Sequence, residues 1–571
     1  MAAHSLVQPH APVDAAPDTA ALLGELRRII GAKHVRVGAD AKRYASGYRC
    51  GVGECLAAVQ PANLSEMWRV LAACVRGGVI VIAQAANTGL TGGSTPWGDY
   101  DRPVIVLSTL RVRGVRLLQG GAQAVCLAGA TLDQLERALR PAGREVHSVI
   151  GSSCLGASVV GGVCNNSGGA LVRRGPAYTE MALYARVDSS GELELINHLG
   201  LDLGDAPEAI MATLDNANED LDTRRLSTKL HASSPDYERH LRDLEAATPA
   251  RYNADPRHLC EASGSAGKVI VFAVRLDTFA PEAATRTFYV GANDPDCLGA
   301  LRRHMLASPL PLPISAEYLH RGAFDMAARF GKDTFLAIRL LGVERLAWLA
   351  RLKNGFDHWL GAGSSDRVLQ RLATSLPPHL PKRMRRMRDA YEHHLLLKVS
   401  ASDADRVASV LDEVLEGRAA AAFECSAEEA AAAFLHRFVT AGAAVRYRAL
   451  HGDEIADIMA LDLALPRNAR DWAETLAPEL SQMLAGTLYY GHFFCHVFHH
   501  DYLVRKGADV AAFECAIHAR LDAIGAEYPA EHNVGHLYHA KPALARHYRD
   551  LDPLNGFNPG VGKLSKQRSW A

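Results

Sequence analysis

The sequence predicts an α+β protein built from more than one domain. Between residues 21 and 275, short apolar runs typical of strands, such as 104–107 and 269–272, alternate with helical patterns such as 64–75. This alternation is typical of domains that combine helices with sheets. The chain has 571 residues, which is too long for one ordinary core and implies roughly three or four folding units.

Local signals mark individual elements. Thr131 is a good N-cap for a helix that starts at residue 132, and Pro141 and Gly143 close that helix. Residues 205–246 are polar and charged, which predicts a loosely packed insertion. Residues 391–525 combine a strand at 393–397 with Ala-rich helices, and this predicts a second domain. The tail from 526 to 571 is rich in proline and glycine and is expected to consist mainly of loops.

Composition excludes several classes of function. The formal net charge is −1, whereas nucleic-acid-binding proteins usually carry a clustered basic surface, so we expect no nucleic acid partner. Eleven cysteines without a Cys-x-x-Cys pair favour a reducing, cytosolic setting. The first twenty residues lack the pattern of a signal peptide and predict a flexible tail. No uncharged apolar run approaches the ~20 residues needed to cross a bilayer, so any membrane contact is expected to be peripheral.

Two stretches of small residues predict a dinucleotide site. Residues 84–94 follow the apolar run 79–82, so a buried strand leads into a loop with glycines at positions 89, 92 and 93. Such glycines allow positive φ, and exposed loop N–H groups can bind phosphate. Residues 151–169 form a second stretch that can approach a flat ligand closely. The P-loop motif and the Rossmann spacing are absent. Either loop alone could be an ordinary turn, but the pair favours a dinucleotide.

Residues 339–388 carry a strong local positive charge. Eleven Lys or Arg face three acidic residues there, a net +8, so the rest of the chain sums to −9. Apolar residues recur at helical spacing around Trp359, and five cations follow within 382–388. A basic, amphipathic, Trp-bearing stretch is typical of contact with an anionic bilayer, where each cation contributes about 1 kcal/mol. The alternative is a solvated helical hairpin that packs on its own domain.

Three histidine-rich places in the C-terminal third are candidates for chemistry: residues 434–437, 491–500 and 531–536. A histidine in an apolar strand is more often a packed core residue than a ligand. Glu531 and His532 stand out because they lie in a loop punctuated by proline and glycine, where acid–base groups tend to be exposed. Histidine also suits proton transfer near neutral pH.

These features occur together in a known family. The loop at 85–94, the stretch around Ser158, the run 164–169 and the closing run 531–536 resemble the FAD-linked oxidases with a PCMH-type flavin domain. Within that superfamily the chain resembles the family of membrane-associated, quinone-dependent D-lactate dehydrogenases. The resemblance extends from about residue 20 to the end. It includes the strings at 84–91, 174–181, 249–256 and 528–538.

The resemblance implies an α+β architecture: a two-part PCMH-type FAD-binding domain, an α/β cap domain for substrate and a basic helical membrane-binding segment. The implied parts are a flexible tail (1–20), the FAD-binding domain (21–277), the cap (278–338 and 391–525), the membrane-binding segment (339–390) and a C-terminal return to the FAD-binding domain (526–571). Residues 430–450 of the cap are expected near the membrane-binding segment.

The resemblance also implies which residues contact FAD. They are Ala85, Ala86, Asn87, Thr88, Gly89, Gly93, Ser94, Gly151, Ser158, Gly168 and Val271. Asn87 stands where the superfamily usually has glycine. This difference bears on the shape of the loop more than on the identity of the cofactor.

Relatives bind the substrate carboxylate with a Trp-x-x-Arg pair, and Phe434 with Arg437 resembles it, with Phe in place of Trp. Arg437 is therefore the first expected carboxylate ligand. Arg446 is the second, since a guanidinium can donate two hydrogen bonds to a carboxylate. Either arginine could instead be a surface or lipid-facing charge.

Relatives also use two histidines seven residues apart and a distant Glu beside a catalytic His, some with a divalent metal. His492, His499 and Glu531 match that pattern and would supply a zinc-like ligand set. The residues between the histidines are Phe-Phe-Cys-His instead of the relatives' Gly-Asp-Gly-Asn, so we expect no metal and keep this triad as the alternative. Without a metal, these side chains are expected to bind the substrate, with His532 as the base.

The implied activity is oxidation of D-lactate to pyruvate by hydride transfer to FAD, with electrons passed to ubiquinone or menaquinone at an anionic membrane surface. The implied location is the cytoplasmic face of a bacterial-type inner membrane. Two alternatives stay open: an enzyme of the same fold that uses oxygen or another D-2-hydroxyacid, and a peripheral membrane protein whose flavin is only structural.

Overall fold

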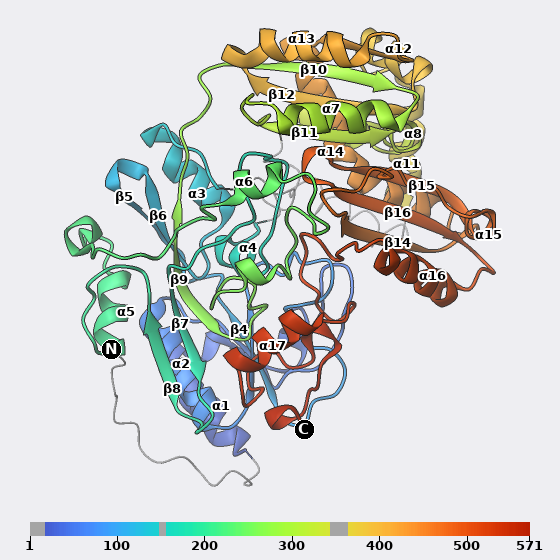
Figure 1. Ribbon diagram of the computed structural model, residues 1–571. Coiled ribbons are helices and arrows are strands. Elements are labelled where there is room, and N and C mark those ends of the chain that lie inside the picture. The colour runs from blue at the N-terminus through green and yellow to red at the C-terminus, as the bar shows by residue number, and fades with distance from the viewer. Residues whose placement is uncertain (1–16, 148–155, 343–363) are drawn as a thin grey trace.

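The computed structural model describes residues 17–147, 156–342 and 364–571. Two bodies are visible in Figure 1: an N-terminal domain in the lower part, and a cap domain above and to the right of it. Helices and sheets are mixed in both, so the α+β prediction is confirmed.

The N-terminal domain contains two sheets. The first has the order β1-β2-β4-β3 and consists of β1 (Val35–Arg36), β2 (Ala57–Val59), β4 (Val104–Ser108) and β3 (Ile80–Gln84). Its apolar side chains share one core with α1 (Thr19–Ile30) and α2 (Leu64–Arg76). The second sheet is antiparallel, in the order β5-β6-β9-β7-β8. Its strands are β5 (Val115–Leu118), β6 (Gln123–Leu127), β9 (Ile270–Asp277), β7 (Ala182–Val187) and β8 (Leu193–Asn197).

The predicted helix at 132 is α3 (Leu132–Leu139), and its start follows the expected capping rule. The Thr131 hydroxyl accepts a hydrogen bond from the Gln134 N–H at 3.1 Å, and the Gln134 side chain accepts one from the Thr131 N–H at 3.1 Å. This capping box satisfies two N–H groups that a helix start leaves open. Gly143 follows the helix with a φ of 63°.

The cap domain is built on a seven-stranded antiparallel sheet in the order β13-β10-β12-β11-β15-β16-β14. Its strands are β10 (Thr285–Ala292), β11 (Ser315–His320), β12 (His393–Ser400), β13 (Ala420–Glu424), β14 (Ile455–Ala464), β15 (Leu484–His492) and β16 (Val497–Arg505). One face packs on α7 (Pro295–Ala307), α13 (Ala404–Leu415) and α16 (Val510–Ala523). The other face packs on α8 (Arg321–Phe330) and α14 (Ala427–Leu450).

Strand register gathers polar side chains on one face of this sheet. Glu317 lies opposite His492, and both Tyr490 and Asp462 lie opposite His499. Because residues directly opposite each other in a ladder point to the same face, these side chains share the face that α8 and α14 cover. Residues that are far apart in sequence therefore meet beneath α14.

The C-terminal segment returns to the N-terminal domain, as its red ribbon with α17 (Pro542–Leu551) shows in Figure 1. Phe557 forms a parallel bridge with Val81 of β3. The Asn558 side chain donates to the Gly93 carbonyl and to the Ala266 carbonyl, each at 2.7 Å. The end of the chain thus supports the loop that follows β3.

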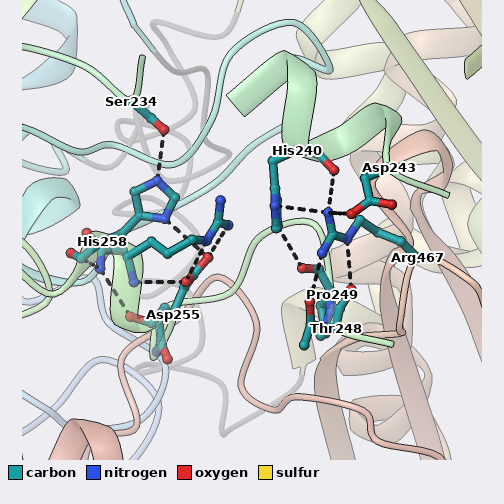
Figure 2. Close-up of polar contacts among 11 residues, drawn as sticks. Ser234, His240, Asp243, Thr248, Pro249, Asp255, His258 and Arg467 are labelled. Atoms are coloured by element: carbon teal, nitrogen blue, oxygen red, sulfur yellow. Dashed lines mark hydrogen bonds and ion pairs between the residues drawn. The ribbon is translucent and has the colours of Figure 1, made fainter. Parts of the chain in front are cut away.

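The prediction of a loosely packed insertion at 205–246 is wrong. The segment contains α5 (Pro207–Asp215) and α6 (Tyr237–Arg242), and Tyr237 is buried in the core of the cap. Figure 2 shows Arg467 of the cap joined to this region: its guanidinium donates to the Thr248 carbonyl at 3.0 Å and lies 2.9 Å from Nδ1 of His240. The polar residues of this segment can lie at a domain interface because the buried Arg467 donates hydrogen bonds to the acceptor groups there.

Part of the predicted membrane-binding segment, residues 343–363 with the run around Trp359, lies outside the described residues. Its described parts are the end of α9 (Lys332–Leu341), α11 (Ser364–Ser375) and α12 (Lys382–Ala390). Leu340, Val368, Leu372 and Leu376 are exposed there. Among the helices of the described ranges, none combines the length and apolar character needed to cross a membrane.

Candidate active site

Asn87 holds the loop that follows β3. Ala85, Ala86, Asn87, Thr88, Gly89, Gly93 and Ser94 all lie in this loop. Asn87 has a φ of 53°, and its side-chain oxygen accepts hydrogen bonds from the hydroxyls of Ser94 (3.0 Å) and Thr95 (3.1 Å). Asparagine tolerates the left-handed conformation, which explains how it replaces the superfamily's glycine. Its side chain also fixes the loop.

The start of α4 (Val159–Cys164) lies beside this loop. Ser158 is the N-cap, and its hydroxyl accepts a hydrogen bond from the Gly161 N–H at 3.0 Å. A methyl group on Gly156 would lie 3.9 Å from Ala86, and one on Gly89 would meet nothing within 4 Å. The two stretches predicted to bind a dinucleotide are therefore neighbours with open space at the loop. Val271 lies buried in β9, and Gly151 lies outside the described residues.

Buried polar atoms without partners mark where a polar ligand fits. Among the described residues, the side-chain oxygens of Asn165, Asn253 and Asn558 are buried and accept no hydrogen bond. Because buried polar groups normally have partners, these atoms fit the hydroxyls and amides of an extended dinucleotide such as FAD.

His532 and Asp462 form a hydrogen-bonded pair. Nδ1 of His532 lies 2.7 Å from Oδ2 of Asp462, and Nδ1 of His499 lies 3.3 Å from Oδ1. Burial alone would raise the pKa of Asp462, but His532 and His499 hold it well below its usual range. Burial alone would lower the pKa of His532, but Asp462 outweighs it and raises that pKa. A carboxylate on Nδ1 selects the tautomer that leaves Nε2 as a proton acceptor, and the His532 side chain is 38% exposed.

The segment that carries His532 is held between the two domains. Ala464 of β14 and Glu527 exchange backbone hydrogen bonds of 2.8 and 2.9 Å, so the segment follows the edge of β14. The Asn253 N–H of the N-terminal domain donates to the Ala530 carbonyl at 2.6 Å, and its side chain donates to the His532 carbonyl. His532 is thereby fixed at the domain junction.

Glu531 is a buried carboxylate that both domains hold. Oε1 lies 2.6 Å from Arg251 and accepts a hydrogen bond from the Gly169 N–H at 3.2 Å, and Oε2 lies 3.4 Å from Nε2 of His492. Burial alone would raise the pKa of Glu531, but Arg251 and His492 lower it to about 2. Glu531 is therefore a fixed anion near neutral pH.

His492 lies between two carboxylates and next to Arg437. Nδ1 of His492 lies 2.7 Å from Oε1 of Glu317, and the Arg437 guanidinium lies 3.1 Å from Oε2 of the same residue. Burial alone would lower the pKa of His492, but Glu317 and Glu531 raise it to about 10. Arg437 also stacks over the ring of Tyr490 at 4.5 Å. The structure thus brings together five predicted residues: His492, His499, Glu531, His532 and Arg437.

The predicted metal alternative also lies in this cluster. Ligand atoms of His492, His499 and Glu531 lie within 4.8 Å of one another, the one such group found among the described residues. Two carboxylates of the cluster, Glu317 and Glu531, already have cationic partners: Arg437 and His492 for Glu317, and Arg251 for Glu531. The expectation of no metal therefore stays a prediction, and the triad remains the alternative.

Arg446 does not join this cluster. Arg446 follows Arg437 by nine residues in α14, about 13.5 Å along the axis and on roughly the opposite side. Its guanidinium lies 2.7 Å from Asp333 of α9 and 2.6 Å from Asp366 of α11, and its side chain is 9% exposed. This position does not fit the expected role of carboxylate ligand. Arg446 instead joins three helices, α9, α11 and α14, at the predicted membrane-binding segment.

Replacing Arg446 with methionine is expected to lower the free energy of unfolding by about 3–5 kcal/mol, because the partly buried Asp333 and the buried Asp366 would both lose their contact with this cation. Thermal unfolding with bound flavin measures the change, and the substrate KM is expected to stay within twofold. The exposed Arg339, paired with Glu428 on the same side of the cap, provides the control, since Arg339→Met should cost less than about 1 kcal/mol. A large KM increase in a stable Arg446→Met protein would restore its role in substrate binding.

Gly168 lies directly against Glu531. A methyl group at this position would overlap the Glu531 carboxylate, so Gly168→Ala is expected to displace Glu531 and lower the turnover number at least 10-fold, since small misplacements in active sites are costly. The control is Gly442→Ala in α14, where an added methyl group meets nothing within 4 Å. Steady-state kinetics with the flavin content measured in parallel checks both variants, and equal turnover would contradict this role of Gly168.

Four residues of the site were not predicted from the sequence: Glu317, Asp462, Arg251 and Asn253. Glu317 and Asp462 are acidic residues inside otherwise apolar strands. A buried carboxylate needs a partner, and this was the available signal. Arg251 and Asn253 lie within the string 249–256, which carried the resemblance without indicating a role for either residue.

Family models match most of both domains. Residues 55–194 match a model described as FAD binding domain, and residues 287–570 match one described as D-lactate dehydrogenase, membrane binding. The first match confirms FAD as the cofactor.

Solved structures share the fold across nearly the whole chain. An alkyldihydroxyacetonephosphate synthase has a TM-score of 0.58 at 12% identity, with 98% of this chain and 87% of that chain covered. The 4-ethylphenol oxidase from Gulosibacter chungangensis has a TM-score of 0.58 at 14% identity, with 96% and 98% covered. These neighbours confirm the PCMH-type fold.

Relatives of much higher identity carry the name quinone-dependent D-lactate dehydrogenase. The protein of Escherichia coli (strain K12) is 51% identical over 561 residues, which cover 97% of this chain and 98% of that protein. The protein of Haemophilus influenzae is 50% identical, with 96% and 99% covered, and that of Corynebacterium glutamicum is 43% identical, with 95% and 97% covered. This chain belongs to the quinone-dependent D-lactate dehydrogenase family.

Proposed function

We propose that this chain oxidises D-lactate to pyruvate at the junction of its two domains and that a membrane quinone, ubiquinone or menaquinone, receives the electrons. The observation that carries the proposal is the pair of His532 and Asp462, which presents an imidazole nitrogen beside the N-terminal domain. The names of the relatives support D-lactate and quinone as the reactants.

The oxidation removes a hydride from Cα of D-lactate and a proton from its hydroxyl group. FAD, when bound, is the acceptor of the hydride. Nε2 of His532 takes the proton, and Asp462, 2.7 Å from Nδ1, stabilises the imidazolium that forms. General-base help of this kind contributes roughly 10²–10⁴-fold to the rate.

Cationic side chains orient the substrate carboxylate. Arg437 and the protonated His492 are both held by Glu317, at 3.1 and 2.7 Å. The shared carboxylate fixes the two cations relative to each other, and fixed cations reduce the orientational freedom that a bound acid must lose. Glu531 holds the other nitrogen of His492 at 3.4 Å.

The acceptor test uses the wild-type protein with vesicles that contain a ubiquinone or a menaquinone analogue. D-Lactate is expected to yield one pyruvate per quinol, and L-lactate is expected to yield none. Pyruvate with hydrogen peroxide but without quinol would assign the enzyme to the oxidases. Absence of pyruvate with every acceptor would reject the proposed activity.

The proposal includes docking on an anionic membrane surface, on the cytoplasmic face of a bacterial-type inner membrane. Lys382, Arg385 and Arg386 of α12 are exposed and have no carboxylate partner among the described residues. Exposed leucines of α9 and α11 belong to the same segment. The cysteines of the described ranges are unpaired, which supports a reducing compartment.

Replacing Lys382, Arg385 and Arg386 together with glutamine is expected to weaken binding to anionic vesicles roughly 100-fold, because each cation near the surface contributes about 1 kcal/mol. Co-sedimentation at low salt measures the partition. The control replaces three cations of the N-terminal domain, Lys33, Arg137 and Arg140, with glutamine. This change should leave vesicle binding unchanged. Equal loss in both variants would indicate a general charge effect instead of a docking surface.

A further inference from the structure

We propose that Arg49 is a second ligand of the substrate carboxylate and that it completes, with Arg437, a clamp that spans the two domains. This inference rests on the proposed function, since it assigns a ligand to the same substrate. Arg437 belongs to α14 of the cap, whereas Arg49 belongs to a loop of the N-terminal domain (residues 46–53). Arg446, the expected second arginine, lies outside the site, so the substrate carboxylate still lacks a second arginine ligand.

The loop 46–53 is anchored to the FAD-binding loop. The Asn87 side chain donates to the Ser46 carbonyl at 2.9 Å, and the Cys50 thiol donates to the Leu90 carbonyl at 3.2 Å. Within the loop, the Gly47 N–H donates to the Gly51 carbonyl at 2.8 Å. Arg49 therefore starts from a backbone that is fixed relative to the cofactor loop.

Arg49 reaches across to the cap. Its guanidinium lies 3.5 Å from the carbonyl oxygen of Ile458, a long contact that leaves most of its donors available. Ile458 belongs to β14, the edge strand of the cap sheet that also carries Asp462, the partner of His532. Arg49 therefore contacts the strand that carries the partner of the proposed base, four residues before Asp462.

The charges of Arg49 and Arg437 both act on one buried carboxyl group of the cap, Asp501. Tyr490 and Asp501 lie on neighbouring strands of the sheet face beneath α14, and the Tyr490 hydroxyl donates to Asp501 at 3.1 Å. Burial raises the pKa of Asp501 to about 6, and Arg49 and Arg437 both oppose that rise. Asp501 thus senses both positive charges, that of Arg49 from the N-terminal domain and that of Arg437, which lies over the Tyr490 ring, from the cap.

Arg49 differs from the other arginines of this region in its partners. Arg437 is paired with Glu317, and Arg251 is paired with Glu531. In the described ranges Arg49 has no carboxylate partner, and its side chain is exposed at the domain junction. A guanidinium binds a planar carboxylate through two parallel hydrogen bonds. An incoming 2-hydroxyacid supplies that carboxylate. Bound between Arg49 and Arg437, it would link the two domains.

The test compares Arg49→Gln with Arg43→Gln, a substitution of a nearby exposed arginine that contacts Tyr44 in its own domain. Because a charge-assisted hydrogen bond contributes more than a neutral one, Arg49→Gln is expected to raise the KM for D-lactate roughly 10–100-fold with a smaller change in kcat. Arg49→Lys is expected to recover part of the loss. With D-lactamide, which lacks the carboxylate, Arg49→Gln and wild type should behave alike. The flavin absorbance of each protein checks that FAD remains bound.

A binding measurement separates this inference from the proposed activity. Oxalate, titrated into the oxidised holoprotein and followed by calorimetry, is expected to bind roughly 10-fold or more weakly to Arg49→Gln than to wild type. An unchanged KM together with unchanged oxalate affinity would overturn the role of Arg49. A wild-type protein that binds oxalate through Arg49 but does not oxidise D-lactate would overturn the proposed substrate and keep the carboxylate site.

Discussion

Flavin reduction by D-lactate is expected to slow roughly 10²–10⁴-fold when His532 is replaced with alanine, because the substrate hydroxyl would lose its proton acceptor. His532 is the histidine of the cluster whose ring is partly exposed, and its Nδ1 is committed to Asp462 at 2.7 Å. Its other nitrogen is the one available for substrate. Anaerobic stopped-flow absorbance measures the reduction step separately from quinone turnover.

The control is His539→Ala, which removes an exposed histidine seven residues further along the same segment. The FAD content of the His532→Ala protein should match wild type, since the His532 ring is held by Asp462 of the cap and not by the FAD-binding loop. Reduction of the flavin at the wild-type rate by the His532→Ala protein would contradict its role as base.

Asp462→Asn is expected to lower the rate of flavin reduction by a comparable factor, roughly 10²–10⁴-fold. In serine proteases the same change at the carboxylate that orients the catalytic histidine costs about 10⁴-fold, because the wrong tautomer forms. Here Asp462 accepts hydrogen bonds from the His532 ring and from the Glu531 N–H at 2.6 Å. Both hydrogen bonds end on Oδ2, and the oxygen of an uncharged amide accepts them more weakly and does not stabilise the imidazolium by charge.

The pH dependence of Asp462→Asn provides a second signature. A base must be neutral to act, so the rate rises with pH through the pKa of His532. Burial alone would lower that pKa, and Asp462 raises it, so loss of the carboxylate should shift the rising limb of the profile to lower pH. Asp457→Asn, an exposed substitution on β14 at a residue paired with Arg448, should leave both the rate and the limb unchanged. If the rising part of the pH–rate profile keeps its position in Asp462→Asn, a group other than His532 controls that titration.

The candidate cofactor loop is easier to recognise in the sequence than the candidate substrate site, and the reason is physical. A phosphate-binding loop is local: the strand at 79–82 and the small residues that follow occur within about fifteen positions of one another. The loop was therefore visible as a pattern, and Asn87 could even be singled out as a departure. Its hydrogen bonds to Ser94 and Thr95 depend only on residues of the same loop.

The substrate site depends on strand register, which the sequence does not display. Glu317 meets His492 across 175 positions, and Asp462 meets His532 across 70. The pairing of β11 with β15 places Glu317 opposite His492. The segment that carries His532 reaches Asp462 by following the edge of β14 at Ala464. Arg446 illustrates the reverse case. It lies near Arg437 in sequence, on the same helix, but its side chain contacts Asp333 and Asp366 and not the site.

The most direct test of the proposed activity is the visible spectrum of the purified protein before and after anaerobic addition of D-lactate and, separately, L-lactate. We predict an oxidised flavin spectrum that D-lactate bleaches rapidly, that L-lactate leaves unchanged, and that recovers when quinone is added. A flavin that neither lactate bleaches would contradict the proposed substrate, and a colourless protein that cannot take up FAD would contradict the cofactor site as well.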